Sequence, residues 1–148
     1  MTNLKNKEPL NSSVIEQLFD ELWPICRSIT GDGLRESFNI LQKIIPLNLH
    51  EVPSGTQVFD WTVPDEWNIN EAYIITPDGD KIADFKVNNL HVVNYSIPVD
   101  KELTFEELDT HLYYKEDLPQ AVPYITSYYK KRWGFCLKYD TYKDLPRD

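Results

Sequence analysis

Apolar residues recur at helical spacing over the first third of the chain. Ser13 and Glu16 form a Ser-x-x-Glu capping box, which predicts the start of a helix. The apolar positions that follow, three or four residues apart, are Ile15, Leu18, Phe19, Leu22, Cys26 and Ile29. Pro24 is expected to kink this helix or mark its last turn. After the turn-rich residues 30–33, a second amphipathic stretch runs over residues 34–45 and stops at Pro46.

Beyond residue 46 the apolar positions alternate with polar ones, which predicts strands. The expected strands are residues 47–49, 57–63, 71–76, 81–85, 91–97 and 133–139. Pro77-Asp78-Gly79-Asp80 predicts a hairpin turn, and the capping box of Thr104 and Glu107 predicts a helix over residues 105–114. Helices first and strands afterwards predict an α+β fold: an N-terminal helix pair, then a small, mainly antiparallel β-rich domain with one short helix.

Charge and composition narrow the classes of partner. The chain of 148 residues carries 24 acidic and 15 basic side chains, a formal charge of −9. This charge disfavours nucleic acids and anionic membranes as partners, because both attract basic surfaces. The polar N-terminus, the lack of a long apolar run and only two cysteines, Cys26 and Cys136, favour the cytoplasm.

The histidines do not form a recognisable metal-binding motif. His50, His91 and His111 are far apart and stand outside the spacings typical of zinc sites. Glu107 and His111 are four residues apart on a predicted helix and could face one ion, but a solvated helix face is favoured without a third ligand. We therefore expect no metal and no cofactor in this chain.

Two groups could be nucleophiles or acids. Cys136 has apolar neighbours, so a buried, inert thiol is favoured over a catalytic thiolate. Asp60 and Glu66 lie beside Trp61 and Trp67, as carboxylates and aromatic rings do in glycosidases. Exposed acids beside core tryptophans are the favoured interpretation in a chain with so many carboxylates.

Aromatic residues are dense near the end of the chain. Tyr124, Tyr128, Tyr129 and Trp133 occur within ten residues, with three basic residues at 130–132. They could pack on a core and its edge. They could also form the wall of a pocket whose basic groups bind a carboxylate, because binding pockets are commonly aromatic with few polar groups.

Several ordered motifs carry a resemblance to a known family. They are Leu22–Gly33, Glu51–Thr56, Asp60-Trp61, Glu66-Trp67, Asn89–Val93, Tyr95-Ser96, Pro123-Tyr124, Thr126–Tyr129 and Trp133–Cys136. Together they resemble the N-terminal part of a bacterial aminopeptidase-like family that is often found near polysaccharide-biosynthesis genes. The resemblance covers about residues 13–140.

The resemblance implies a zinc aminopeptidase with an inserted β-rich domain. It divides the chain into a flexible tail (1–12), the helical start of a peptidase-like domain (13–50), the inserted β-rich domain (51–117) and a return segment (118–148). The family's zinc ligands are expected downstream of Asp148, so zinc is implied for the full-length family and the chain alone is expected to be inactive. The family pattern has a basic residue where this chain has Ile125.

The implied function is the non-metal-binding front of a zinc aminopeptidase-like hydrolase that shapes or covers the substrate cleft. Its partner would be the missing C-terminal peptidase portion or a second copy of the chain. The alternatives are a free-standing module with an aromatic groove for a peptide or glycan, and an autonomous enzyme using Cys136 or the Asp60/Glu66 pair. The expected substrate-binding residues are Arg27, Trp61, Trp67, His91, Tyr124, Tyr128 and Tyr129. If residues 13–45 belong to a larger domain, their apolar faces should be exposed here over more than ~600 Å².

Overall fold

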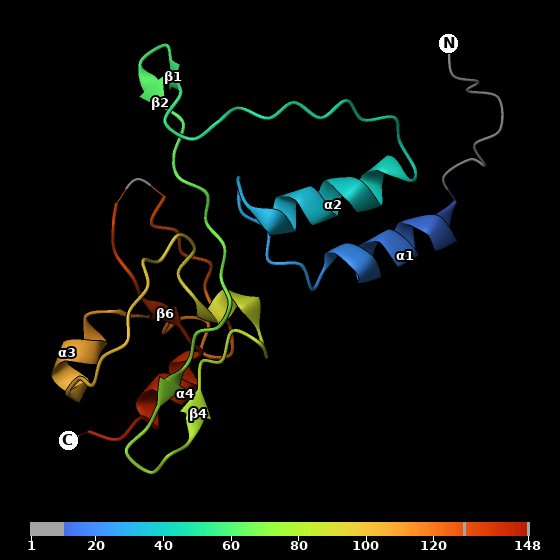
Figure 1. Ribbon diagram of the computed structural model, residues 1–148. Helices are drawn as coiled ribbons and strands as arrows, with labels where there is room; N and C mark the ends of the chain where they lie inside the picture. The colour runs from blue at the N-terminus through green and yellow to red at the C-terminus, as the bar shows by residue number, and fades with distance from the viewer. Residues whose placement is uncertain (1–10, 129, 148) are drawn as a thin grey trace. The chain divides into compact units, whose positions relative to one another are not determined.

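Two helices open the described part of the chain, which comprises residues 11–128 and 130–147 of the computed structural model (Figure 1). Helix α1 spans Ser12–Leu22, and its N-cap is Asn11, whose side chain accepts a hydrogen bond from the Val14 amide at 2.9 Å. Asparagine is among the best N-cap residues, so the helix begins before the predicted Ser13–Glu16 box. It ends ahead of Pro24, and Cys26 lies outside it.

Helix α2 spans Asp32–Gln42 and lies beside α1 (Figure 1). Its N-cap is Gly31, whose φ of 95° suits glycine alone. The N-cap residue has no side chain to accept from the first turn, and the Asp32 amide instead donates to the Asn68 side chain at 2.8 Å. The helix pair predicted from the apolar spacing is confirmed.

A small hairpin follows a segment without regular structure. Strands β1, Gln57–Val58, and β2, Trp61–Thr62, pair antiparallel with Val58 opposite Trp61. The sequence predicted one strand over residues 57–63, and the two-residue loop at Phe59 and Asp60 breaks it into a hairpin. The strand predicted at residues 47–49 is wrong, because these residues make no ladder with a partner strand.

The second half of the chain contains the remaining strands. Strands β3, Ile74–Ile75, and β4, Lys81–Ile82, form the antiparallel hairpin that the sequence predicted. Strands β5, Leu112–Tyr113, and β6, Phe135–Cys136, pair in parallel. The strand predicted over residues 91–97 is instead the 3-10 helix η1, Asn89–His91, followed by single bridges from Val92 to Phe135 and from Asn94 to Thr126.

Two short helices complete the fold. Helix α3, Phe105–Asp109, has the predicted capping box of Thr104 and Glu107, with both hydrogen bonds present. It ends earlier than predicted because Leu112 and Tyr113 pair as a strand. Helix α4, Tyr139–Lys143, was not predicted. Across the described residues, no helix combines the length and apolar character needed to cross a bilayer. The predicted α+β class is confirmed.

The chain divides into two compact units, Met1–Asn68 and Ile69–Asp148. In the part of the chain that the structure describes, the buried apolar side chains all belong to the second unit: Ala83, Val92, Val93, Leu112, Phe135, Cys136, Leu137 and Leu145. Among the described residues of the first unit, only Gly31 and Ser37 are buried. The core of the molecule is therefore the core of the second unit. The domain boundaries that the family resemblance implies remain predictions.

Candidate functional site

Arg35 on α2 is the centre of a carboxylate cluster in the first unit. Its guanidinium lies 3.2 Å from Asp32 and 3.1 Å from Glu51, and it binds both carboxylate oxygens of Glu66. The hydrogen bond from Arg35, together with its charge, holds the pKa of Glu66 below its usual range. Glu66 is therefore ionised at neutral pH and cannot be the proton donor that a glycosidase pair with Asp60 requires.

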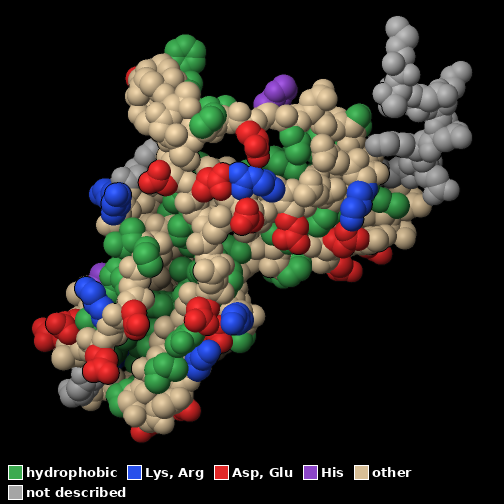
Figure 2. All heavy atoms as spheres, viewed as in Figure 1, with side chains coloured by type: hydrophobic (Ala, Val, Ile, Leu, Met, Phe, Trp, Pro, Cys, Tyr) green, Lys and Arg blue, Asp and Glu red, His purple; other side chains and the backbone are tan. Residues whose placement is uncertain are grey.

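The sequence analysis did not identify Arg35. The only local signal is its spacing of three residues from Asp32, which allows an ion pair along one helix face. The bonds to Glu51 and Glu66 join residues 16 and 31 positions apart, so no local pattern could reveal them. Figure 2 shows red and blue side chains next to each other at several places on one face of the molecule.

Trp67, an expected substrate-binding residue, lies against the start of α2. A Cβ atom at Gly31 would be 2.4 Å from the Trp67 carbonyl oxygen and 2.7 Å from the Asn68 side chain. This close approach requires glycine at residue 31. The segment from Glu66 to Asn68 thus docks on α2 through one carboxylate, one carbonyl and one amide.

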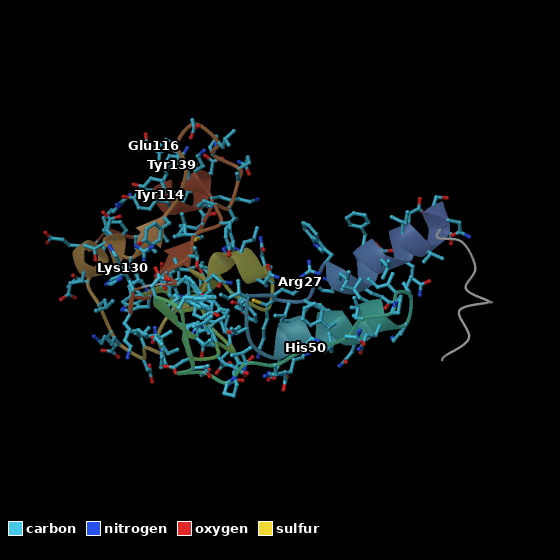
Figure 3. The ribbon with its side chains drawn as sticks, turned by 90° about the horizontal axis from the view of Figure 1, so that it is seen from above. Arg27, His50, Tyr114, Glu116, Lys130 and Tyr139 are labelled. Carbon is cyan, nitrogen blue, oxygen red and sulfur yellow. The ribbon has the colours of Figure 1, made fainter. Side chains whose placement is uncertain are left out.

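The other expected substrate-binding residues are distributed over both units. Arg27 is exposed in the connection between α1 and α2 (Figure 3), and Trp61 is 40% exposed in β2. His91, Tyr124 and Tyr128 belong to the second unit. Tyr129 lies outside the described residues.

His91 has one ring nitrogen engaged in the second unit. Its Nδ1 lies 2.7 Å from the carbonyl oxygen of Cys136, so Nδ1 carries the proton and donates it. In the neutral ring, Nε2 is then the acceptor. This is the tautomer that a histidine uses to accept a hydrogen bond from a ligand or to bind a metal.

The pairing of Glu107 and His111 around an ion is not supported. The Glu107 carboxylate accepts from the Thr104 amide at 3.0 Å within the α3 cap. The His111 ring stacks on Trp133 at 3.7 Å, with Nδ1 3.1 Å from the Trp133 carbonyl oxygen. Within the described ranges, no three His, Cys, Asp or Glu side chains are placed to hold a metal ion.

The aromatic run near the end of the chain has several different environments. Tyr128 packs edge-on against Tyr95 at 5.1 Å, and Trp133 stacks on His111. Tyr124 is 63% exposed. These contacts favour core-and-edge packing for Tyr128 and Trp133, and they leave Tyr124 as an aromatic side chain available to a partner.

A second aromatic group, which the sequence analysis missed, surrounds Tyr142. Its ring stacks on Tyr114 at 3.9 Å, and the Arg147 guanidinium lies 4.8 Å from it and 4.0 Å from Phe105. Figure 3 shows Tyr114 near Tyr139, with the ring centroids 5.3 Å apart. The hydrogen bond with Tyr142, with burial as a second cause, raises the pKa of Tyr114 to about 12. The rings already serve one another as partners, so the group stabilises the end of the chain.

Cys136 is unsuited to nucleophilic catalysis. It is fully buried in β6, and burial raises the pKa of its thiol to about 11. The interpretation of Cys136 as a buried core residue is confirmed. Cys26 is half-buried, and burial raises the pKa of its thiol as well.

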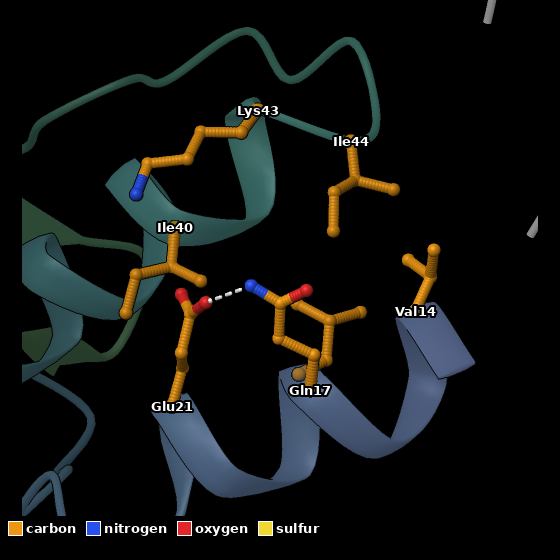
Figure 4. A pocket seen from close by; sticks show the side chains of 7 residues that line it. Val14, Gln17, Glu21, Ile40, Lys43 and Ile44 are labelled. Carbon is orange, nitrogen blue, oxygen red and sulfur yellow. Dashed lines mark hydrogen bonds between the residues drawn. The ribbon is translucent and has the colours of Figure 1, made fainter. Parts of the chain in front are cut away.

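A pocket of about 200 Å³ lies between α1 and α2 (Figure 4). Its lining is aliphatic with a polar rim: Val14, Gln17, Leu18, Glu21, Ile40, Lys43 and Ile44. The Gln17 side chain donates to Glu21 at 2.8 Å on one rim. The chemistry of the pocket suits an apolar group, and its rim carries one negative side chain, Glu21, and one positive side chain, Lys43.

Comparison with known proteins gives two similar relatives from Clostridium acetobutylicum. One, provisionally named a polysaccharide biosynthesis protein with an aminopeptidase-like domain, is 51% identical over 147 residues, which cover 97% of this chain and 34% of that protein. The other is a crystal structure of a protein provisionally named a peptidase; it has a TM-score of 0.88 and 51% identity, over 92% of this chain and 32% of that one. The chain thus spans about a third of the length of these relatives, and its resemblance to aminopeptidase-like proteins is confirmed.

A family model covers the whole of the second unit. It matches residues 66–148, and its description is a domain of unknown function, DUF2172. The match begins at Glu66, three residues before the second unit starts. Because the model covers more than half of the chain, the protein belongs to the DUF2172 family.

Proposed function

We propose that this chain is the N-terminal, non-metal-binding portion of a zinc-dependent aminopeptidase-like hydrolase, where it shapes or covers the substrate cleft. The proposal is supported by the identity with one third of a longer relative whose name includes an aminopeptidase-like domain. The metal ligands would come from the part of the longer protein that this chain does not span, because the described residues do not fit a zinc site.

The observation that carries the proposal is a second apolar face on α1. Ile15, Phe19 and Trp23 are spaced by four residues, so they share one side of the helix and its end, and they are 45%, 68% and 80% exposed. Val14 and Leu18 on the same helix line the pocket beside α2. An apolar arc on a helix that is broader than the side facing its neighbour is typical of a helix inside a larger domain, and adjacent exposed apolar side chains mark an interaction surface.

We assign this stripe to packing against the remaining two thirds of the longer protein. A zinc site there would supply an activated water and polarise the scissile carbonyl. The residues of this chain would bind and orient the substrate. Arg27 is suited to a carboxylate, and the exposed ring of Tyr124 is suited to the wall of the cleft. His91 would accept a hydrogen bond at Nε2.

A chimera tests the proposal. This chain would replace the matching third of the Clostridium relative, and zinc content, melting temperature and release of N-terminal amino acids from peptides would be measured. The chimera is expected to bind zinc and to cleave, and Trp23→Asp should lower the melting temperature markedly and abolish cleavage. Val87→Asp, at an 81% exposed apolar position of the second unit, is the matched control and should have little effect.

Two results would contradict the proposal. The first is stoichiometric, tightly bound zinc in the isolated chain. The second is a chimera whose stability is unchanged by Trp23→Asp, since the stripe would then have no partner in the longer protein. Arg27→Ala separates binding from folding, because it should raise KM for the peptide and leave the melting temperature unchanged.

The second candidate is a free-standing module that binds a peptide or glycan. The exposed rings of Trp61 and Tyr124 favour it, because aromatic faces stack on sugars and on peptide side chains. Calorimetric titration of the isolated chain with peptide and glycan collections tests it. Micromolar binding that is lost in Trp61→Ala or Tyr124→Ala would support this candidate over the first.

A further inference from the structure

Two aromatic rings of the second unit share one cation. The ring centroids of Phe105 on α3 and Tyr142 on α4 (Figure 1) are 6.2 Å apart. The guanidinium carbon of Arg147 is 4.0 Å from the centroid of the first ring and 4.8 Å from that of the second. A guanidinium at these distances is attracted by the negative faces of the rings. Phe105 and Tyr142 are half-buried, so each leaves part of its ring accessible, and together we call them the two-ring clamp.

The clamp keeps its shape through contacts other than those with Arg147. The ring of Tyr142 stacks on Tyr114 at 3.9 Å, and the α3 helix that carries Phe105 has a complete capping box. Arg147 itself is exposed, and its Nη2 donates to the Tyr142 carbonyl oxygen at 3.5 Å, which is a long and therefore weak hydrogen bond. The clamp is therefore preformed, and Arg147 is an occupant that another cation could replace.

Negative charge lies close to the clamp. Asp109 follows Phe105 by four residues, so the two share one side of α3. The Oδ1 atom of Asp109 is buried and accepts no hydrogen bond from the described part of the chain. The hydrogen bond with Tyr142 and burial are the main causes that raise the pKa of Tyr114, and the charges of Asp109 and Glu116 (Figure 3) add to them. Both carboxylates therefore act on this group of rings, and the site favours a cation with N–H donors.

We propose that the two-ring clamp binds the guanidinium group of an arginine side chain in a peptide, and that Arg147 occupies the clamp until such a ligand displaces it. A guanidinium is favoured over an ammonium because it is planar, stacks on aromatic rings and is more weakly hydrated. Its N–H donors lie in one plane and can reach a carboxylate while the rings contact its face. The site lies within the second unit and needs no zinc, so it is independent of the function proposed above.

Arg147→Ala tests the site by removing the internal competitor. A tethered group has an effective concentration in about the millimolar range, so its removal should lower the dissociation constant of N-acetyl-arginine amide about tenfold. Titration of the 148-residue chain, followed by the NMR signals of the Phe105 and Tyr142 ring protons, measures the constant. The original chain should show the same shifts at about tenfold higher ligand concentration. If neither chain shows them up to about 100 mM ligand, the site does not exist. Equal constants in the two chains would contradict the role of Arg147 as occupant.

The choice of ligand tests the chemistry of recognition. N-acetyl-citrulline amide has nearly the shape of the arginine compound and no charge, so it should bind at least about tenfold more weakly to Arg147→Ala. N-acetyl-lysine amide keeps the charge and should bind with intermediate strength, because its ammonium is strongly hydrated and does not stack. Added salt should weaken the binding of both cations. Equal binding of the arginine and citrulline compounds would overturn the proposal.

Substitutions in the Arg147→Ala chain locate the site. Phe105→Leu keeps an apolar side chain and removes one ring of the clamp, so it should weaken binding of the arginine compound about tenfold or more. Tyr73→Leu is the matched control, because the Tyr73 ring also carries a cation, Lys81 at 3.9 Å from its centroid, and its loss should leave the binding unchanged. Melting temperatures show that each variant is folded. Binding that survives Phe105→Leu, or that falls equally in Tyr73→Leu, would place the ligand elsewhere and rule out the clamp.

Discussion

Helix α1 and the β1–β2 hairpin expose large apolar side chains and have no buried apolar core, whereas the second unit has such a core, although it also exposes single apolar side chains such as Val87 and Tyr124. Phe19, Trp23 and Phe59 are 68%, 80% and 97% exposed, while Val93 and Leu137 are fully buried. The first unit is held by polar contacts at the ends of its elements, such as the Asn68 cap and the Arg35 cluster. The second unit is held by side-chain packing.

The two units therefore differ in the interactions that stabilise them. Burial of apolar area is the main stabilising term in folding, so the second unit has the means to be stable by itself. Polar contacts at the surface contribute little net free energy, so the first unit has less stabilisation of its own than the second. The family model fits this division, because its match at residues 66–148 nearly coincides with the unit that has a core.

The largest expected effect is on the core of the second unit. Leu137→Ala removes a fully buried side chain beside β6 and should lower the free energy of unfolding by about 2–5 kcal/mol. Phe19→Ala on α1 should change it by less than about 0.5 kcal/mol in the isolated chain. Urea denaturation followed by circular dichroism measures both. Equal losses for the two variants would remove the distinction between the units.

The next largest expected effect is a difference in reaction rate between the thiols of the two cysteines. A thiol with a pKa of about 11 has roughly a hundredfold less thiolate at pH 8 than an ordinary cysteine, and Cys136 is also fully buried. Cys136 should therefore react with a disulfide reagent at least tenfold more slowly than the half-buried Cys26 in the native chain. Stopped-flow absorbance with Cys26→Ser and Cys136→Ser assigns the two rates. Similar rates would indicate that the core of the second unit opens readily.

Substitution of Gly31 tests how much the polar contacts of the first unit contribute to its stability. Gly31→Ala forces a strained φ and places a Cβ 2.4 Å from the Trp67 carbonyl oxygen, so it should cost roughly 1–3 kcal/mol locally. Hydrogen exchange of the α2 amides measures this loss. Gly55→Ala is the matched control in the same unit, because its φ is also positive but no atom lies within 4 Å of the added Cβ. The exchange of α2 should be unchanged in the control.

The smallest expected effect is the loss of the bond between Arg35 and Glu66 at acidic pH. Because Arg35 lowers the folded pKa of Glu66, the bond's contribution is present above the unfolded pKa of about 4.3 and is lost as pH falls through the folded pKa. Hydrogen exchange of the Asp32 amide should accelerate over this range relative to its intrinsic rate. In Glu66→Gln this acid-dependent step should be absent, and Asp65→Asn should retain it. A step that persists in Glu66→Gln would assign the transition to another carboxylate.

Local patterns predicted local structure well. The apolar spacing placed both opening helices, Pro77–Asp80 placed the β3–β4 hairpin, and Thr104 with Glu107 placed the start of α3. The failures involve distant partners. Residues 91–97 were predicted as a strand because they alternate, yet only Val92 and Asn94 find single bridges, to Phe135 and Thr126.

The candidate site was less predictable for the same reason. Aromatic and basic residue types could be chosen as substrate-binding residues, and their roles remain proposals. The cluster around Arg35 joins Asp32, Glu51 and Glu66 from segments far apart in the chain. The pocket between α1 and α2 exists only because the two helices lie side by side.

The sequence by itself determined the α+β class, the helix pair and the caps, because periodicity and hydrogen-bonding side chains act within a few residues. It also carried the resemblance to aminopeptidase-like proteins. Only the tertiary structure decided which apolar residues are covered. Phe19 and Leu137 are alike as apolar side chains in the sequence, and packing with distant segments buries Leu137 and leaves Phe19 exposed.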